Sequence, residues 1–217
     1  MVTDIPAFLP TILVVMLLTL LPLMTVMATA FTKISIVLML LRNAMGVQQA
    51  PSVMVINSIA LTLTLFIMVP VGDSILSQIE SKGPISNDWE GIRSMYEIVS
   101  GSFVEYLSKF TNPKELNFFM DAAMQIWPET LHHHIHEQNI FLLLPAHLTS
   151  EVTRAFQIAF LLFLPFVVID MVVSNVLLAM GAMMVPPMLV SLPIKILLFV
   201  AADGWSRLLH GLMISYV

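Results

Sequence analysis

Residues 170–195 read "DMVVSNVLLAMGAMMVPPMLVSLPIK" and combine features that a straight membrane helix does not have. The apolar run is interrupted by Gly181 and then by the adjacent residues Pro186 and Pro187. Glycine readily adopts the left-handed backbone conformation, and proline lacks an amide donor, so neither favours an unbroken helix. The sequence therefore predicts two helices joined by a turn at 181–187.

Two charged side chains, Asp170 and Lys195, lie on the two halves of this predicted hairpin. An unpaired charge inside a membrane helix costs about 2.5–3.5 kcal/mol even on the most lenient insertion scale. At about 1.5 Å per helical residue, both side chains lie at a similar depth from the turn. We expect them to pair, either within one subunit or between adjacent subunits of a ring. A snorkelling Lys195 with a helix-end Asp170 is the simpler alternative, but an aspartate side chain is too short to reach water from there.

The composition is typical of a helical membrane protein. Of the 217 residues, 58% are hydrophobic and 11% are charged, and there is no cysteine, whereas soluble domains carry about 25% charged residues. Charges are absent from 5–32 and 43–72, and Asp170 is the only charge in 155–194. About 20 apolar residues cross the hydrocarbon layer. We therefore expect an all-α protein with four apolar helices, the last of them over about 187–202.

The central region, 73–150, differs from the rest because it carries most of the charges and the loop sequences "SKGPISND" and "TNPKE". Apolar residues recur there at helical spacing, which predicts two or three amphipathic helices outside the membrane. We read 1–217 as one domain, with an apolar helix pair in 1–72 and a second pair in 151–217. The bases Lys33 and Arg42 are expected in a short cytoplasmic loop, which places the central region on the other side.

Prolines interrupt the apolar segments at Pro22, Pro70, Pro165 and Pro193. Each proline removes a backbone donor and tends to kink its helix, and in lipid the freed carbonyl needs another partner. We therefore expect bent hairpins packed against protein, although proline is also simply more frequent in membrane helices. The polar residues that accompany the prolines are Asn57, Ser58, Thr62, Thr64, Ser174 and Asn175.

Other clusters carry weaker signals. Glu151 and Arg154 are spaced to pair on one helix face, with Thr149 or Ser150 as the N-cap of a helix that starts there. The histidines in "LHHHIHEQ" (131–138) are expected on a solvated face, with a metal site or a pH effect as lesser alternatives. No nucleophile elbow, phosphate loop, dinucleotide fingerprint or basic patch occurs in the sequence, which argues against an enzyme or a nucleic-acid-binding protein.

Two long blocks of the sequence resemble a known family. The blocks are "FTKISIVLMLLRNAMGVQQAPSVMVINSIALTLTLF" (31–66) and "EVTRAFQIAFLLFLPFVVIDMVVSNVLLAMGAMMVPPMLVSLPIKILLFVAADGW" (151–205). Both resemble the SctR/FliP proteins, the export-gate subunits of type III secretion systems in injectisomes and flagella. The acidic N-terminus, "MVTDIPAFLP", does not look like a cleaved signal and is more similar to the injectisome branch.

The resemblance implies a pentamer that winds into a helical assembly with two smaller membrane proteins, the SctS/FliQ-like and SctT/FliR-like subunits. It implies a location in the bacterial inner membrane, with the assembled complex largely on the periplasmic side. It further implies a channel for unfolded secreted proteins that has no catalytic residue and no cofactor. Two other functions stay open from the residues alone. One is a small-solute or ion transporter that uses Asp170 and Lys195 as a relay, and the other is a purely structural assembly scaffold.

The resemblance also gives the turn a role, as a methionine-rich constriction of the pore. The family pattern has three methionines, an aliphatic residue and two prolines. This sequence matches it with alanine in place of the first methionine. A methionine side chain is flexible and polarizable, so a ring of them can seal the pore and still yield to a passing chain. The implied gasket residues are Met180, Ala182, Met183, Met184 and Val185, shaped by Gly181, Pro186 and Pro187. The charged residues Glu151, Arg154, Asp170 and Lys195 match positions where polar contacts hold neighbouring subunits together.

Overall fold

The computed structural model describes residues 12, 15, 19, 23, 26–47, 51–83, 89–182 and 184–217. Within these ranges every regular element is helical, which confirms the predicted all-α class. The elements are α2 (Phe31–Ala44), α3 (Val53–Lys82), α4 (Trp89–Phe110), α5 (Pro113–Ile126), the 3-10 helix η1 (Glu129–His134), α6 (Ile140–Ala179), α7 (Pro187–Ala201) and α8 (Gly204–Ile214).

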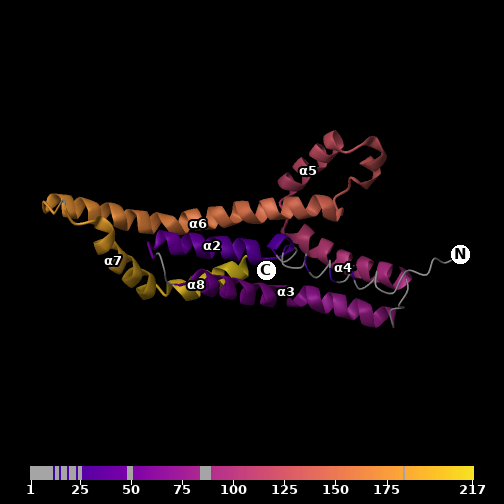
Figure 1. The fold of residues 1–217 in the computed structure, drawn as a ribbon, viewed down its shortest axis with the longest axis horizontal. Coiled ribbons are helices and arrows are strands. Elements are labelled where there is room, and N and C mark those ends of the chain that lie inside the picture. The colour runs from indigo at the N-terminus through magenta and orange to yellow at the C-terminus, as the bar shows by residue number, and fades with distance from the viewer. Residues whose placement is uncertain are drawn as a thin grey trace.

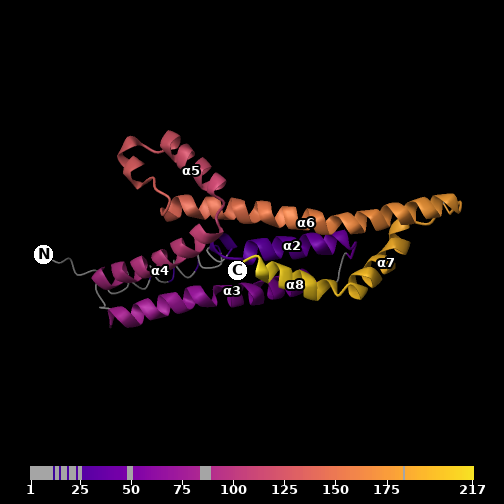
Figure 2. The same ribbon diagram turned by 180° about the vertical axis from the view of Figure 1, so that it is seen from behind.

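The helices form an elongated rod (Figures 1 and 2). Helix α6 runs along most of its length, with α2 beside it. The turn from α6 to α7 forms one end of the rod, and the far ends of α3 and α4 form the other. Helix α5 and η1 project to one side as an arm. Helix α8 returns toward the middle, so the C-terminal end lies beside α2.

Helix α2 is the buried centre of the fold. Ile34, Val37, Leu38 and Leu41 are at most 1% exposed, and their spacing places them on one helix face. They pack against α3 and α6, with Phe166 and Phe199 in the same core. The expected cytoplasmic loop from Lys33 to Arg42 is therefore wrong: it is a helix, and Lys33 is buried inside the rod. The placement of that segment in the cytoplasm assumed a short basic loop, so it no longer has support.

Helix α6 begins earlier than the sequence indicates. Its N-cap is Asn139, whose side chain accepts a hydrogen bond from the Phe141 amide. Thr149 and Ser150 lie inside the helix, so the expected cap at these positions is wrong. The Ser150 hydroxyl instead donates to the Ala146 carbonyl and accepts from the Asn112 amide, at 2.7 and 2.9 Å. Ser150 thus fastens the start of α5 to α6.

The prolines sit inside continuous helices. Pro70 lies within α3, Pro165 within α6 and Pro193 within α7, whereas Pro22 is outside the described residues. The hydroxyls of Ser58, Thr62 and Thr64 donate to carbonyls four residues earlier in α3, none of which a proline frees. The sharp bends lie elsewhere, at the α6–α7 turn and at the 61° angle between α7 and α8. Asp203, at φ 53°, takes up the second bend.

Two described helices, α3 and α6, are long and apolar enough to cross a membrane. The bent pair of α7 and α8 passes the same test when it is taken as one broken span. Most of the apolar segment before Lys33 lies outside the described residues. The fourth predicted helix, over 187–202, is confirmed as α7.

Candidate functional site

The α6–α7 turn has a well-defined backbone geometry. Helix α6 ends with Gly181 at φ +75°, where its amide donates to the Leu178 carbonyl at 3.0 Å. The next amide, of Ala182, donates to the Leu177 carbonyl at 2.9 Å. This pair of bonds is the Schellman motif, which satisfies carbonyls at the helix end and suits glycine. Pro187 then occupies the first turn of α7, where a missing amide costs nothing.

The turn exposes its apolar side chains at the tip of the rod. Met184 is 97% exposed, Met180 is 74% exposed and Val185 is 41% exposed, while Ala182 is half-buried. The remaining predicted gasket residue, Met183, lies outside the described residues. Among the residues that the structure describes, none covers these side chains, so they are available to neighbouring molecules.

The two charges of the hairpin meet within one subunit. Lys195 Nζ lies 2.6 Å from Asp170 Oδ2, and it also donates to the Ala44 carbonyl at 3.1 Å. Ala44 is the last residue of α2, where helix carbonyls lack intrahelical partners and the helix dipole favours a cation. One lysine therefore ties α7 to both α6 and α2. The second Asp170 oxygen, Oδ1, is buried without a hydrogen-bond partner in the described structure.

A second charged cluster lies near mid-length, around Glu151. Its Oε1 is 3.4 Å from Lys33 Nζ and 3.5 Å from Arg154 Nη1, and its Oε2 accepts a hydrogen bond from the Tyr216 hydroxyl. Lys33 and Glu151 side chains are each 1% exposed. The predicted pair of Glu151 and Arg154 is thus present, and the glutamate is turned inward toward α2 and the C-terminal end. A buried carboxylate is tolerable only with such partners.

Arg154 binds the C-terminal end of α4 in the same way as Lys195 binds that of α2. Its Nη1 donates to the Phe110 carbonyl at 2.9 Å, and Phe110 is the last residue of α4. Its side chain is 39% exposed, in contrast to the buried glutamate. Both cations thus stabilise the C-terminal end of another helix, and both hold an acid on α6.

Sequence reasoning missed several members of this cluster. Tyr216 packs edge-on against Phe110, with the Lys33 ammonium 3.5 Å from its ring centroid. Burial and the neighbouring Glu151 carboxylate raise the pKa of Tyr216, and the same two causes raise the pKa of Tyr106. His147 is fully buried beside Tyr106, with neither ring nitrogen hydrogen-bonded in the described structure. Of these three residues, only His147 could have been noticed in the sequence, because it is a lone histidine within an apolar segment.

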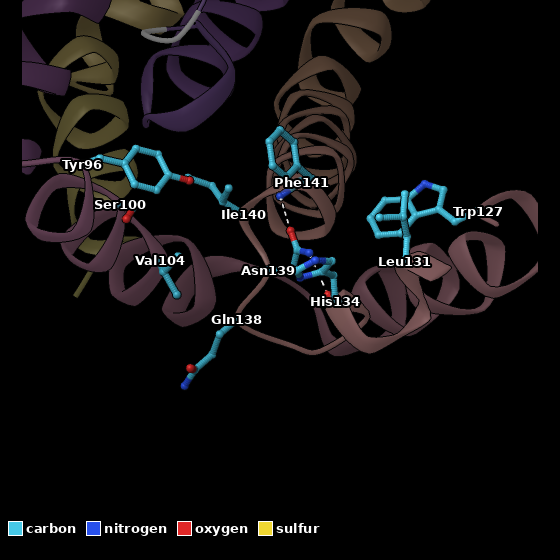
Figure 3. A pocket seen from close by; sticks show the side chains of 10 residues that line it. All are labelled: Tyr96, Ser100, Val104, Trp127, Leu131, His134, Gln138, Asn139, Ile140 and Phe141. Carbon is cyan, nitrogen blue, oxygen red and sulfur yellow. Dashed lines mark hydrogen bonds between the residues drawn. The ribbon is translucent and has the colours of Figure 1, made fainter. Parts of the chain in front are cut away.

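The projecting arm encloses a pocket of about 580 Å³ against α4 and the start of α6 (Figure 3). Tyr96 and Val104 line it from the α4 side and Trp127 from the arm (Figure 3). His134, from the histidine-rich segment, also lines it, and its carbonyl accepts a hydrogen bond from Asn139. The lining residues include no charged side chain. Among the described residues, no three histidine or acidic side chains are grouped to hold a metal ion.

Comparison with known proteins places the chain in a family. The FliP family profile matches residues 14–212. Yop proteins translocation protein R of Yersinia pestis is 46% identical over 205 residues, covering 94% of each chain. Hypersensitivity response secretion protein HrcR of Ralstonia nicotianae is 42% identical, covering 91% of this chain and 92% of the relative. Surface presentation of antigens protein SpaP of Salmonella typhi is 41% identical and covers 92% of both chains. With a profile match over nearly its whole length and relatives of this similarity, the chain belongs to the FliP family.

Proposed function

We propose that this chain is a pore-forming core subunit of a type III secretion export apparatus of the injectisome kind. In this proposal it conducts unfolded proteins across the bacterial inner membrane, with the assembled complex largely on the periplasmic side. Family membership supports it, as do relatives whose names describe translocation and secretion. The chain acts as a conduit without catalysis, so the driving energy comes from other components.

The observation that carries the proposal is the exposed tip of the α6–α7 hairpin. Met184 is almost fully exposed and Met180 largely so, at the end of a rigid helix pair locked by the bond between Lys195 and Asp170. Repeated around a ring, such tips bring soft, unbranched side chains together at one level. They close against ions and small solutes and repack around a passing chain. Ala182 replaces a methionine of the family pattern, so the seal is thinner at that level.

Assembly with other subunits is part of the proposal. A lone rod exposes many large apolar side chains along α3 and α6, among them Phe66, Leu65, Phe160 and Leu161, each at least 63% exposed. Apolar surface of this extent marks contacts with protein or lipid. We propose that a pentamer of this chain, with SctS/FliQ-like and SctT/FliR-like subunits, covers part of it and that membrane lipid covers the rest.

Site-specific cross-linking tests the proposal directly. A photo-cross-linking amino acid is placed at Met184 in the assembled complex while a secretion substrate is stalled in transit. The matched control is the same label at Met124 of α5, which is 55% exposed on the arm. We expect substrate adducts from position 184 and none from 124. If position 184 gives no adduct while other positions in the channel do cross-link to the substrate, the protein is instead a scaffold that does not line the pore.

A further inference from the structure

A second concave site lies at mid-length, away from the hairpin tip. It is a pocket of about 460 Å³ where α2, α4, α6 and the residues that follow α8 meet. Three cationic side chains line it: Lys33 from α2, Lys109 from α4 and Arg154 from α6. Gln157, one turn after the arginine, adds an amide to the lining. This gathers three of the nine lysines and arginines of the chain at one place.

The pocket carries more positive charge than its surroundings neutralise. Among the described residues no acidic side chain lines it, and Glu151, whose carboxylate contacts two of the three cations, already serves Lys33, Arg154 and the Tyr216 hydroxyl. Lys109 is exposed and makes no ion pair within the described residues; its ammonium faces the Phe110 ring at 5.3 Å. An electropositive cavity of this kind attracts an anion with several acceptor oxygens.

The position of the pocket along α6 indicates the kind of anion. Arg154 is the last charge of α6 before an apolar segment, 155–179, that is interrupted only by Asp170. At about 1.5 Å per residue this segment is about 37 Å long, enough to cross the hydrocarbon layer of about 30 Å. Phe156 and Phe160 are 56% and 65% exposed just beyond the pocket. In a subunit whose α6 crosses the membrane, the cations therefore lie where a polar head group meets acyl chains.

We propose that this pocket binds the phosphodiester head group of an anionic phospholipid. Arg154 and Lys109 contact the phosphate oxygens, with Gln157 as an additional donor, while the acyl chains lie along the exposed aromatic side chains of α6. Guanidinium groups suit phosphate geometry, and basic pockets between helices at the membrane surface bind such head groups. The site stands apart from the hairpin tip, and its occupancy does not depend on the pore function.

The test uses the full chain purified in detergent and titrated with phosphatidylglycerol or phosphatidylcholine. Native mass spectrometry then measures the fraction of protein that retains one lipid. Two variants probe the site, Lys109→Gln and Gln157→Glu, the second placing a negative charge in the pocket. The control is Lys114→Gln, which removes an exposed lysine on α5 away from the pocket. A parallel titration with inorganic phosphate separates a lipid ligand from a free anion.

We expect the chain to retain phosphatidylglycerol in preference to phosphatidylcholine, with weaker retention at high salt. Loss of one lysine contact to an anionic lipid weakens binding about fivefold, and Gln157→Glu weakens it further. Lys114→Gln should behave as wild type. Equal retention of the two lipids by the wild-type chain overturns the proposal without any variant. The proposal is also overturned if both pocket variants bind the lipid with unchanged affinity, or if millimolar inorganic phosphate displaces the lipid. It is overturned as well if the same variants lose oligomers whether or not lipid is present.

Discussion

Lys195 and Asp170, 25 positions apart, form an ion pair of 2.6 Å that closes the α6–α7 hairpin. The same ammonium group donates to the carbonyl of Ala44 at the end of α2. The lysine side chain is 6% exposed, while the aspartate side chain is 42% exposed. A single side chain thus holds three helices in register behind the exposed tip.

Removal of this lysine should destabilise the hairpin. Lys195→Met keeps an unbranched side chain of similar length but leaves the Asp170 carboxylate and the Ala44 carbonyl without their cation. We expect a loss of about 2–4 kcal/mol in the free energy of unfolding, the range for breaking a partly buried charged hydrogen bond. Denaturant titration in detergent measures it. The double variant with Asp170→Asn should lose less than Lys195→Met alone, and losses that simply add would show that the two residues are not coupled.

The Glu151 cluster predicts a larger effect for a single substitution. Glu151→Gln leaves Lys33 charged and 1% exposed without a counter-ion, which should cost about 3–5 kcal/mol of unfolding free energy. Replacing both partners, as Lys33→Met with Glu151→Leu, should recover much of this loss. The exposed pair of Arg93 and Glu97 on α4 is the control, where Glu97→Gln should change stability by less than about 1 kcal/mol. Similar losses at both sites would contradict the buried pairing.

Stability should fall at alkaline pH because of buried tyrosines. Burial and the Glu151 carboxylate raise the pKa of Tyr216 above the ordinary tyrosine value. An unfolded tyrosine loses its proton near pH 10, whereas the folded side chain keeps it. The unfolded state therefore binds fewer protons above that pH, and the free energy of unfolding decreases as pH rises. Melting temperatures measured from pH 8 to 11.5 should fall steeply, and less steeply for Tyr216→Phe; identical slopes would refute the linkage.

The gasket predicts a leak when its methionines are shortened. Met184→Ala removes the most exposed apolar side chain of the tip, so the closed complex should conduct ions or small dyes more readily. Conductance of the assembled complex in planar bilayers measures this, with Met124→Ala on the arm as the matched control. Ala182→Met, which restores the family pattern, should reduce any residual leak. Conductance that stays the same in Met184→Ala would exclude a sealing role for this side chain.

The bend between α7 and α8 depends on a glycine for a steric reason. A Cβ atom at Gly204 would overlap the ring of Phe199, which itself packs edge-on against Trp205. Gly204→Ala should therefore lower stability by about 1–3 kcal/mol, the range for overpacking. Gly211→Ala lies in the same helix with open space around it and should be neutral or stabilising by up to about 1 kcal/mol. Thermal unfolding in detergent distinguishes the two, and equal behaviour would argue against the contact.

Several features of the fold were predictable because their causes are local. The turn at 181–187 follows from glycine and proline backbone chemistry, and α7 begins at Pro187 as expected. The all-helical class follows from long apolar segments without strand-like alternation. Gly181 takes the left-handed conformation, with φ +75°, which residues that carry a Cβ atom rarely adopt. The similar depth of Asp170 and Lys195 also follows from helical rise alone.

Other features were missed because their causes lie far away in the chain. Glu151 and Thr149 look like the start of a helix, yet α6 begins at Ile140 and passes through both. Lys33 looks like a loop charge, yet it neutralises Glu151 across 118 positions of sequence. No local pattern shows that these two charges meet, so the orientation inferred from Lys33 had no sound basis.

The sequence by itself determined the helical class and the broken hairpin with its turn at 181–187, because backbone propensities and apolar length act over a few residues. The tertiary structure decided which charges are buried, which helix ends Lys195 and Arg154 stabilise, and how the C-terminal end returns to Glu151. Those choices depend on desolvation, since a charge enters the core only where packing brings it an opposite charge from a distant segment.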